Sequence, residues 1–167
     1  AETFRQHDLL REYEALLLGA VDFSERSVNQ PIEGRAARSH FRRVETLCIR
    51  SAELPDLPPV TVTRVLCRLD TGRTHQIRLH ARYLGCPVLG DRLHGVRTPT
   101  LLPPPPRLCL HAARLSLRHP RTGSTLDFAC PLPADLSGYL DALRQLAATS
   151  DGAGSHRARP ETASEAP

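Results

Sequence analysis

The sequence predicts an α+β fold, in which helices pack against a mixed, mainly antiparallel sheet. The chain has 167 residues, of which 40% are hydrophobic and 24% charged, which suits one globular domain of mixed type or a domain plus a tail. Five segments alternate apolar and polar residues or are rich in β-branched residues, as strands are. Two others space their apolar residues as one face of a helix does.

The first predicted strand covers residues 11–19. Within it Tyr13, Ala15 and Leu17 share one face at period two, and Gly19 ends the strand. Residues 1–8 before it have the pattern of the last turns of a helix.

Two longer strands are predicted in the middle of the chain. Residues 39–50 and 60–69 are β-branched and apolar with polar interruptions, and the proline-containing turn 54–59 joins them. We therefore expect them to pair antiparallel. Residues 21–38 are polar and are expected to form a loop or a β-arm.

A change of period after Gly72 predicts the first full helix. Ile77, Ala81 and Leu84 fall at i, i+4 and i+7 and form one apolar face, and Gly85 ends the helix.

The last third of the chain begins with a stiff loop. Residues 96–107 contain four consecutive prolines, which neither a helix nor an inner strand accommodates. Residues 109–117 and 125–129 are predicted strands joined by the Pro- and Gly-containing turn 119–123.

An amphipathic helix is predicted over residues 134–147. The residues after it are small, polar or proline, a composition typical of disorder. We therefore expect a domain over residues 1–147 and a disordered tail over residues 148–167.

The composition argues against several classes of protein. No apolar run is long enough to span a bilayer and no secretion signal is visible, so we expect no membrane partner and a cytoplasmic location. The five cysteines form no C-x-x-C pair, and His75 and His80 lie off a common helical face, so we expect reduced thiols and no metal. The absence of G-x-S-x-G, H-E-x-x-H and a Gly-rich phosphate loop disfavours a hydrolase or metalloenzyme. We expect a monomer. Because methionine is absent, we also expect a fragment or a processed chain.

The distribution of charge points to a polyanionic partner. All 22 basic residues are arginine, and seven of them lie in residues 64–97 against two aspartates. A local excess of arginine is typical of nucleic-acid binding, although a solvated basic face has the same composition.

Residues 69–95, LDTGRTHQIRLHARYLGCPVLGDRLHG, are the most informative stretch. They predict a strand, a glycine turn and a helix whose first turn carries arginines, an arrangement that can hold a phosphate or a carboxylate. Each member also has a simpler role. Thr74 can be an N-cap, His75 a surface or capping residue, and Arg82 a solvated neighbour.

This stretch closely resembles the signature of RNA pseudouridine synthases of the RluA-like type. The stretches FRQHDLLREYEALLLG and LCLHAARLSLRHPRTGSTLDFACPLPADL are similar to other parts of that family, so the resemblance covers about residues 4–143. It implies an RNA partner, rRNA or tRNA, and an enzyme that flips a uridine out of folded RNA, detaches the base, rotates it and rejoins it through carbon. It implies no cofactor and no metal.

The resemblance also assigns roles to individual residues. Tyr13 matches the tyrosine that stacks on the base and helps proton transfer, and Arg78 matches the arginine that pairs with a nucleophilic aspartate. Leu110 is expected to line the pocket. The remaining substrate-binding candidates, expected to order the site or touch the RNA backbone, are Arg73, His75 and Gln76.

The family's aspartate lies in an HRLD motif before the tyrosine strand, and these 167 residues contain no such motif. Asp70 in RLDTGRTH is not a substitute, because it follows Tyr13 and precedes a different motif; we expect a turn or capping role for it. The chain therefore resembles the C-terminal part of the catalytic domain and is expected to be inactive alone. The alternative is a non-catalytic RNA-binding module.

Overall fold

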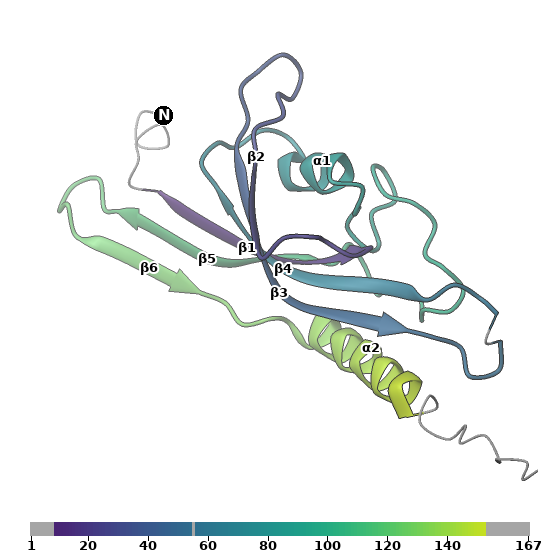
Figure 1. Cartoon of the computed structure of the whole chain (residues 1–167). Coiled ribbons are helices and arrows are strands. Elements are labelled where there is room, and N and C mark those ends of the chain that lie inside the picture. The colour runs from purple at the N-terminus through teal and green to yellow at the C-terminus, as the bar shows by residue number, and fades with distance from the viewer. Residues whose placement is uncertain (1–8, 55, 153–167) are drawn as a thin grey trace, which may run out of the picture.

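The computed structural model describes residues 9–54 and 56–152 and contains one six-stranded sheet with two helices (Figure 1). The strand order across the sheet is β2-β3-β4-β1-β5-β6. The elements are β1 (Leu10–Leu18), β2 (Glu25–Val28), β3 (Ser39–Ile49), β4 (Val60–Leu69), α1 (Gln76–Tyr83), β5 (Leu110–Arg118), β6 (Thr125–Ala129) and α2 (Ala134–Gly152).

The predicted α+β class and the mainly antiparallel sheet are confirmed. Every pairing between these strands is antiparallel within the described residues. The five predicted strands are all present, and the polar stretch 21–38 contributes β2 as an edge strand, which is the β-arm alternative. Residues 96–107 contain neither helix nor strand, as predicted. The helix expected over residues 1–8 lies outside the described residues.

Strand β1 lies inside the sheet and continues past the end of β5. Its outer neighbour there is the segment that follows α1, because Leu18 N–H donates to the Pro87 carbonyl and Leu89 N–H donates to the Leu16 carbonyl. Leu89 in turn accepts from Cys109 N–H. The chain after α1 is therefore fixed to the same strand that carries the candidate tyrosine.

The two helices lie on opposite faces of the sheet. Ser39 of β3 is opposite Leu69 of β4 and contacts α1, whereas Glu45 is opposite Arg64 and contacts α2. Residues 69 and 64 differ by an odd number, so their side chains point to opposite faces. We call these the α1 face and the α2 face.

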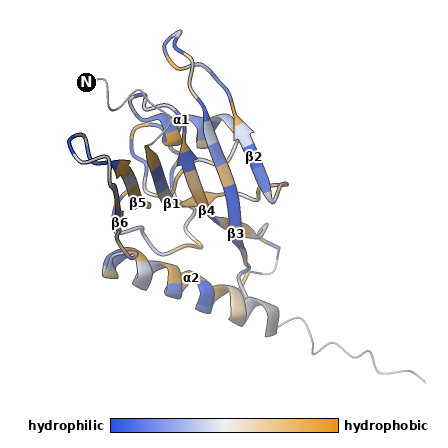
Figure 2. Ribbon diagram, turned by 90° about the vertical axis from the view of Figure 1, so that its left-hand side faces the viewer, coloured by the Kyte–Doolittle hydropathy of each residue, from blue (hydrophilic) through white to orange (hydrophobic). Residues whose placement is uncertain are grey.

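Helix α2 is held mainly by apolar contact. Leu136, Leu140 and Leu143 are at most 2% exposed and belong to the hydrophobic core. In Figure 2 the helix crosses the lower end of the sheet and carries both apolar and polar residues along its length.

The end of α2 corrects the sequence-based boundary. The helix was expected to end at residue 147 but continues to Gly152. Ser150 Oγ accepts from the Arg50 N–H and also donates to the Arg50 carbonyl, so a contact with the end of β3 extends the helix beyond its apolar pattern. Residues 153–167 of the predicted tail lie outside the described residues.

All five cysteines are free thiols, and Cys67, Cys86 and Cys109 are buried. No helix in the described part of the chain is long and apolar enough to cross a membrane.

Candidate functional site

The turn before α1 differs from the prediction. The first helical turn was expected to include residues 73–75, but α1 begins at Gln76, and His75 precedes it in the left-handed region at φ 54°. Thr74 is exposed and no side chain caps the helix. The reason lies in Gln76, whose side chain organises the turn from inside the protein.

Gln76 is 2% exposed and uses both ends of its amide. Its Oε1 accepts from Thr71 Oγ1 at 2.8 Å and from Arg73 N–H at 3.0 Å. Its Nε2 donates to the Arg38 carbonyl and to Ser39 Oγ. Because these partners come from the turn and from β3, Gln76 ties the start of α1 to the sheet, which favours the ordering role over direct contact with RNA.

Arg78 forms a two-point ion pair with Asp91. Its Nε donates to Asp91 Oδ2 at 2.8 Å, and its Nη2 donates to Oδ1 at 2.6 Å. The Asp91 side chain is 1% exposed and the Arg78 side chain 14%. Such a paired geometry is stronger and more directional than a single contact.

Asp91 remains ionised in this environment. Burial alone raises its pKa, but the hydrogen bonds from Arg78 and from the His94 and Leu93 N–H groups outweigh burial, so the pKa of Asp91 lies well below its ordinary value of 3.8. The hydrogen bonds to Asp91, and then its charge, in turn raise the pKa of Arg78. The pair is therefore a stable carboxylate–guanidinium unit at neutral pH.

This pairing leaves one edge of Arg78 available. A guanidinium has five N–H donors, and Asp91 uses one on Nε and one on Nη2. Nη1 makes no hydrogen bond to residues that the structure describes. Arg78 can thus bind a second carboxylate or a phosphate through Nη1 without releasing Asp91.

Tyr13 and Leu110 lie together on the α1 face. Tyr13 is opposite Cys67 of β4 and Ala112 of β5, and Leu110 is opposite Ala15. Diagonal neighbours on adjacent strands are within reach of an aromatic side chain. Both side chains are partly buried against the core, which suits the wall of a pocket.

The Arg78–Asp91 pair is joined to the strand that carries Tyr13. Asp91 follows Leu89 by two residues, and Leu89 is hydrogen-bonded to Leu16 of β1. Tyr13 and Leu110 therefore lie on the α1 face, and Arg78 belongs to the helix on that face.

A histidine pair closes the outer side of this turn. His75 Nδ1 and His94 Nε2 are 2.8 Å apart, and the ring centroids are 4.9 Å apart. Partial burial and then the charge of Arg78 lower the pKa of His94. Arg73 is not part of this pair; its Nε donates to the Ala36 carbonyl before β3.

Asp70 has partners of its own. Its Oδ2 lies 2.8 Å from His40 Nε2 and 4.0 Å from Arg38 Nη1. His40 Nδ1 lies 2.7 Å from Ser27 Oγ, so Asp70 belongs to a polar chain that joins β2, β3 and the end of β4. Asp70 thus makes side-chain contacts between strands where a turn or capping role was expected, and its exclusion as a nucleophile stays a prediction.

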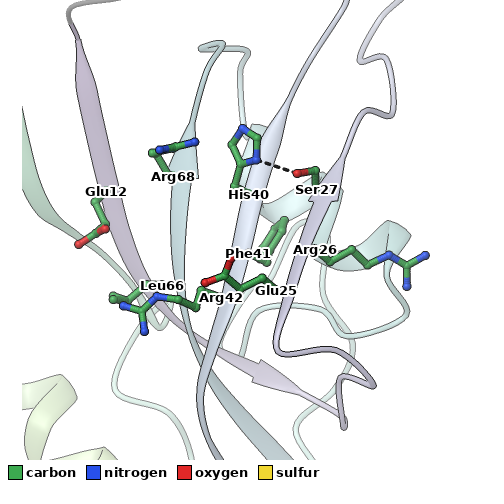
Figure 3. A pocket seen from close by; sticks show the side chains of 9 residues that line it. All are labelled: Glu12, Glu25, Arg26, Ser27, His40, Phe41, Arg42, Leu66 and Arg68. Carbon is green, nitrogen blue, oxygen red and sulfur yellow. Dashed lines mark hydrogen bonds between the residues drawn. The ribbon is translucent and has the colours of Figure 1, made fainter.

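The Ser27–His40 part of this chain borders an open pocket of about 230 Å³ (Figure 3). Glu12, Arg68 and His40 lie in one register row across β1, β4 and β3. Glu12 is next to Tyr13 in the strand and points to the opposite face. The pocket is therefore separate from the Tyr13 and Arg78 site; its lining is Glu12, Glu25, Arg26, Ser27, His40, Phe41, Arg42, Leu66 and Arg68.

Asp91 and His94 are the two site residues that the sequence analysis did not single out. The sequence feature that could have drawn attention to them is the pair of glycines, Gly90 and Gly95, on either side. Gly90 has φ +73°, and a Cβ on Gly95 would lie 2.4 Å from the Asp91 carbonyl oxygen. Because a side chain at either glycine would clash with backbone atoms, the two glycines indicate a tight turn between them.

No protein-family model matches the chain. The chain is 34% identical, over an alignment of 181 residues, to RNA pseudouridine synthase 2, chloroplastic, of Oryza sativa subsp. japonica; the match covers 91% of this chain and 40% of that protein. It is 35% identical over 158 residues to ribosomal large subunit pseudouridine synthase D of Vibrio parahaemolyticus, covering 84% of this chain and 47% of that protein. The chain spans less than half the length of these two relatives.

Solved structures show the same likeness. Human RNA pseudouridylate synthase domain containing 1 superimposes with a TM-score of 0.61 at 25% identity, covering 86% of this chain and 69% of that chain. A second human structure, RNA pseudouridylate synthase domain containing 4, has a TM-score of 0.61 at 21% identity and supports the fold alone.

Proposed function

The chain belongs to the RNA pseudouridine synthase family, and from this premise we propose that it carries the tyrosine- and arginine-bearing part of an enzyme that isomerises uridine to pseudouridine in structured RNA, either rRNA or tRNA. The observation that carries the proposal is the two-point pair with Asp91, which fixes Arg78 on α1, the helix on the face that holds Tyr13. We further propose that the enzyme acts in the cytoplasm as a monomer.

The reaction needs no external oxidant or reductant. The bond between ribose C1′ and uracil N1 breaks, and a bond between C1′ and C5 forms. C5 loses a proton and N1 gains one, so atoms and electrons balance within the nucleotide. A flipped base must be held while it rotates, because unstacking costs a few kcal/mol.

Tyr13 and Arg78 supply two of the required functions. The Tyr13 ring stacks on the flipped uracil, and its hydroxyl helps to move the proton from C5. Arg78 binds the nucleophilic aspartate of the family and keeps it ionised and aimed at C1′. Leu110, diagonal to Tyr13, lines the base pocket.

The residues at the start of α1 order the site or touch the RNA backbone. His75 is exposed and Arg73 half-buried, so both can reach a phosphate. Gln76 holds their turn in place. The nucleophile itself has to come from a residue outside this 167-residue sequence, which is why the chain alone is expected to be inactive.

The test is an assay of RNA that carries tritium at uridine C5. The longest gene product that contains this sequence is compared with the 167-residue chain, on rRNA and on tRNA separately. We expect tritium release and pseudouridine only with the longer product. Activity of the 167-residue chain would return Asp70 to consideration as the nucleophile, with Asp70→Ala as the next variant. Inactivity of both on both RNAs would favour a non-catalytic RNA-binding module.

A further inference from the structure

We propose that Asp91 is a positioning residue for the isomerisation, holding Arg78 so that its Nη1 edge alone faces the nucleophilic carboxylate. This inference rests on the proposed function, and it concerns a residue to which the resemblance assigned no role. In this arrangement one guanidinium bridges two carboxylates. Asp91 occupies the Nε and Nη2 side, and the nucleophile occupies the Nη1 side.

The bridge fixes the direction of Arg78. An arginine side chain has several rotatable bonds, and a single partner leaves its plane free to turn. Two contacts of 2.8 Å and 2.6 Å to a carboxylate that is 1% exposed remove that freedom. A small misplacement of a positioning group can cost about 100-fold in rate, so a fixed guanidinium matters for catalysis.

Asp91 is itself held by the turn that carries it. Its Oδ1 accepts from Leu93 N–H at 3.0 Å and from His94 N–H at 2.9 Å. The same turn touches the start of α1 a second time, through His94 and His75. The turn therefore clamps the start of α1 at two points, one of which is the Arg78 ion pair.

The two carboxylate oxygens of Asp91 have different partners. Oδ1 accepts from the two turn N–H groups and from Arg78 Nη2, whereas Oδ2, among the residues that the structure describes, accepts only from Arg78 Nε. In Asp91→Asn the amide oxygen can replace Oδ1, and an NH2 group replaces Oδ2. This variant therefore keeps the hydrogen bonds of the turn. At the former Oδ2 position, however, the NH2 group of asparagine faces Arg78 Nε–H, and two donors cannot form a hydrogen bond.

The experiment measures kcat and KM of the longest active gene product with Asp91→Asn. We expect kcat to fall by about 100-fold, with KM for RNA unchanged, because the RNA contacts are retained. The matched control is Asp127→Asn. Asp127 also forms a two-point pair, with Arg114 at 2.9 Å and 2.6 Å, but it lies on edge strand β6. We expect the control to keep full kcat.

A double-mutant cycle separates positioning from general support. Arg78→Lys keeps a charge but cannot make the two-point contact. If Asp91 acts through Arg78, adding Asp91→Asn to Arg78→Lys lowers kcat by no more than about twofold further. Full kcat in Asp91→Asn would overturn the positioning role of Asp91 and leave the proposed function standing. A loss of about 100-fold that repeats in the Arg78→Lys background would do the same. An inactive wild type would instead overturn the proposed function and the positioning role with it.

Discussion

Arg78 and Tyr13 were identified as single residues from the sequence, but the partner of Arg78 within the chain was not. Asp91 lies 13 positions away in sequence, and its carboxylate meets Arg78 only because the segment after α1 returns along β1. A tertiary contact of this kind leaves no periodic trace in the sequence. The resemblance pointed to Arg78 as the candidate arginine, and the structure shows that Asp91 holds it.

Removing the Tyr13 hydroxyl should separate stacking from chemistry. Tyr13→Phe keeps the ring on the α1 face, so RNA affinity is expected to stay close to wild type. The loss of the hydroxyl is expected to lower kcat by about 100-fold or more, the usual size of a proton-transfer contribution. Single-turnover rates and RNA binding of the longest gene product check this, and equal rates in the two proteins would exclude a role for the hydroxyl.

His80 should make the stability of the fold depend on pH. It is fully buried, its Nε2 lies 2.9 Å from the Gln30 carbonyl, and its Nδ1 lies 2.9 Å from Ser39 Oγ. Because a carbonyl only accepts, Nε2 carries the proton and Nδ1 accepts from Ser39. Burial lowers the pKa of His80, and the hydrogen bond to Gln30 offsets this only in part.

The direction of the pH dependence of stability follows from the lowered pKa of His80. The unfolded chain, with an ordinary His80 pKa near 6.5, binds the proton more readily than the folded one. The stabilisation is thus complete above about pH 6.5 and is lost as pH falls toward the folded pKa. Urea unfolding at about pH 7.5 and about pH 5.5 should show this loss, and His80→Gln should reduce it. An unchanged pH dependence in His80→Gln would exclude His80 as its source.

Among the elements, the turn from Gly90 to Gly95 links the sheet to the site. Sequence periodicity located the strands well, because β1, β3 and β4 are long and β-rich. It placed the start of α1 too early, because the buried Gln76 amide, and not an N-cap, organises that turn. The end of α2 depends on the contact between Ser150 and Arg50, residues 100 positions apart, which periodicity cannot report.

Gly90 should be the glycine least tolerant of a side chain in this region. It has φ +73°, and a Cβ there would lie 2.1 Å from the Arg107 carbonyl oxygen. Gly85, with φ +74° and nothing within 4 Å, is a matched control. Gly85→Ala is expected to cost about 1–2 kcal/mol of unfolding free energy, from the backbone conformation alone. Gly90→Ala is expected to cost more than about 3 kcal/mol, because backbone must also move. Chemical denaturation of both variants checks this, and similar losses would argue against a steric role for Gly90.

For the molecule as a whole, the predicted basic segment is less available than its composition indicated. Arg64 is paired with Glu14 and Glu45, and Arg78 with Asp91, so two of its seven arginines serve the fold and the site. Arg82 and Arg92 are exposed and remain suited to RNA phosphates. Charge counting therefore indicates the same class of partner as the proposed function, whereas the availability of each arginine depends on acidic residues far away in the sequence.

The fold class and the family could be read from one sequence because the central motif is long and specific. The arrangement of the site could not, because it depends on which residues the sheet brings to the α1 face. Tyr13 is placed there by strand alternation, which the sequence does report. The turn that carries Asp91 reaches that face through hydrogen bonds to β1, which the sequence does not report.

The most direct test of the central claim is the rate of pseudouridine formation by the longest gene product with Arg78→Ala, measured beside its RNA affinity. We expect the rate to fall by about 1,000-fold with RNA binding largely intact, because Arg78 is proposed to hold the nucleophile and not the RNA. Arg114→Ala, which removes an exposed arginine on β5, is the control and should keep the wild-type rate. Near-normal turnover in Arg78→Ala would show that Arg78 does not hold the nucleophile.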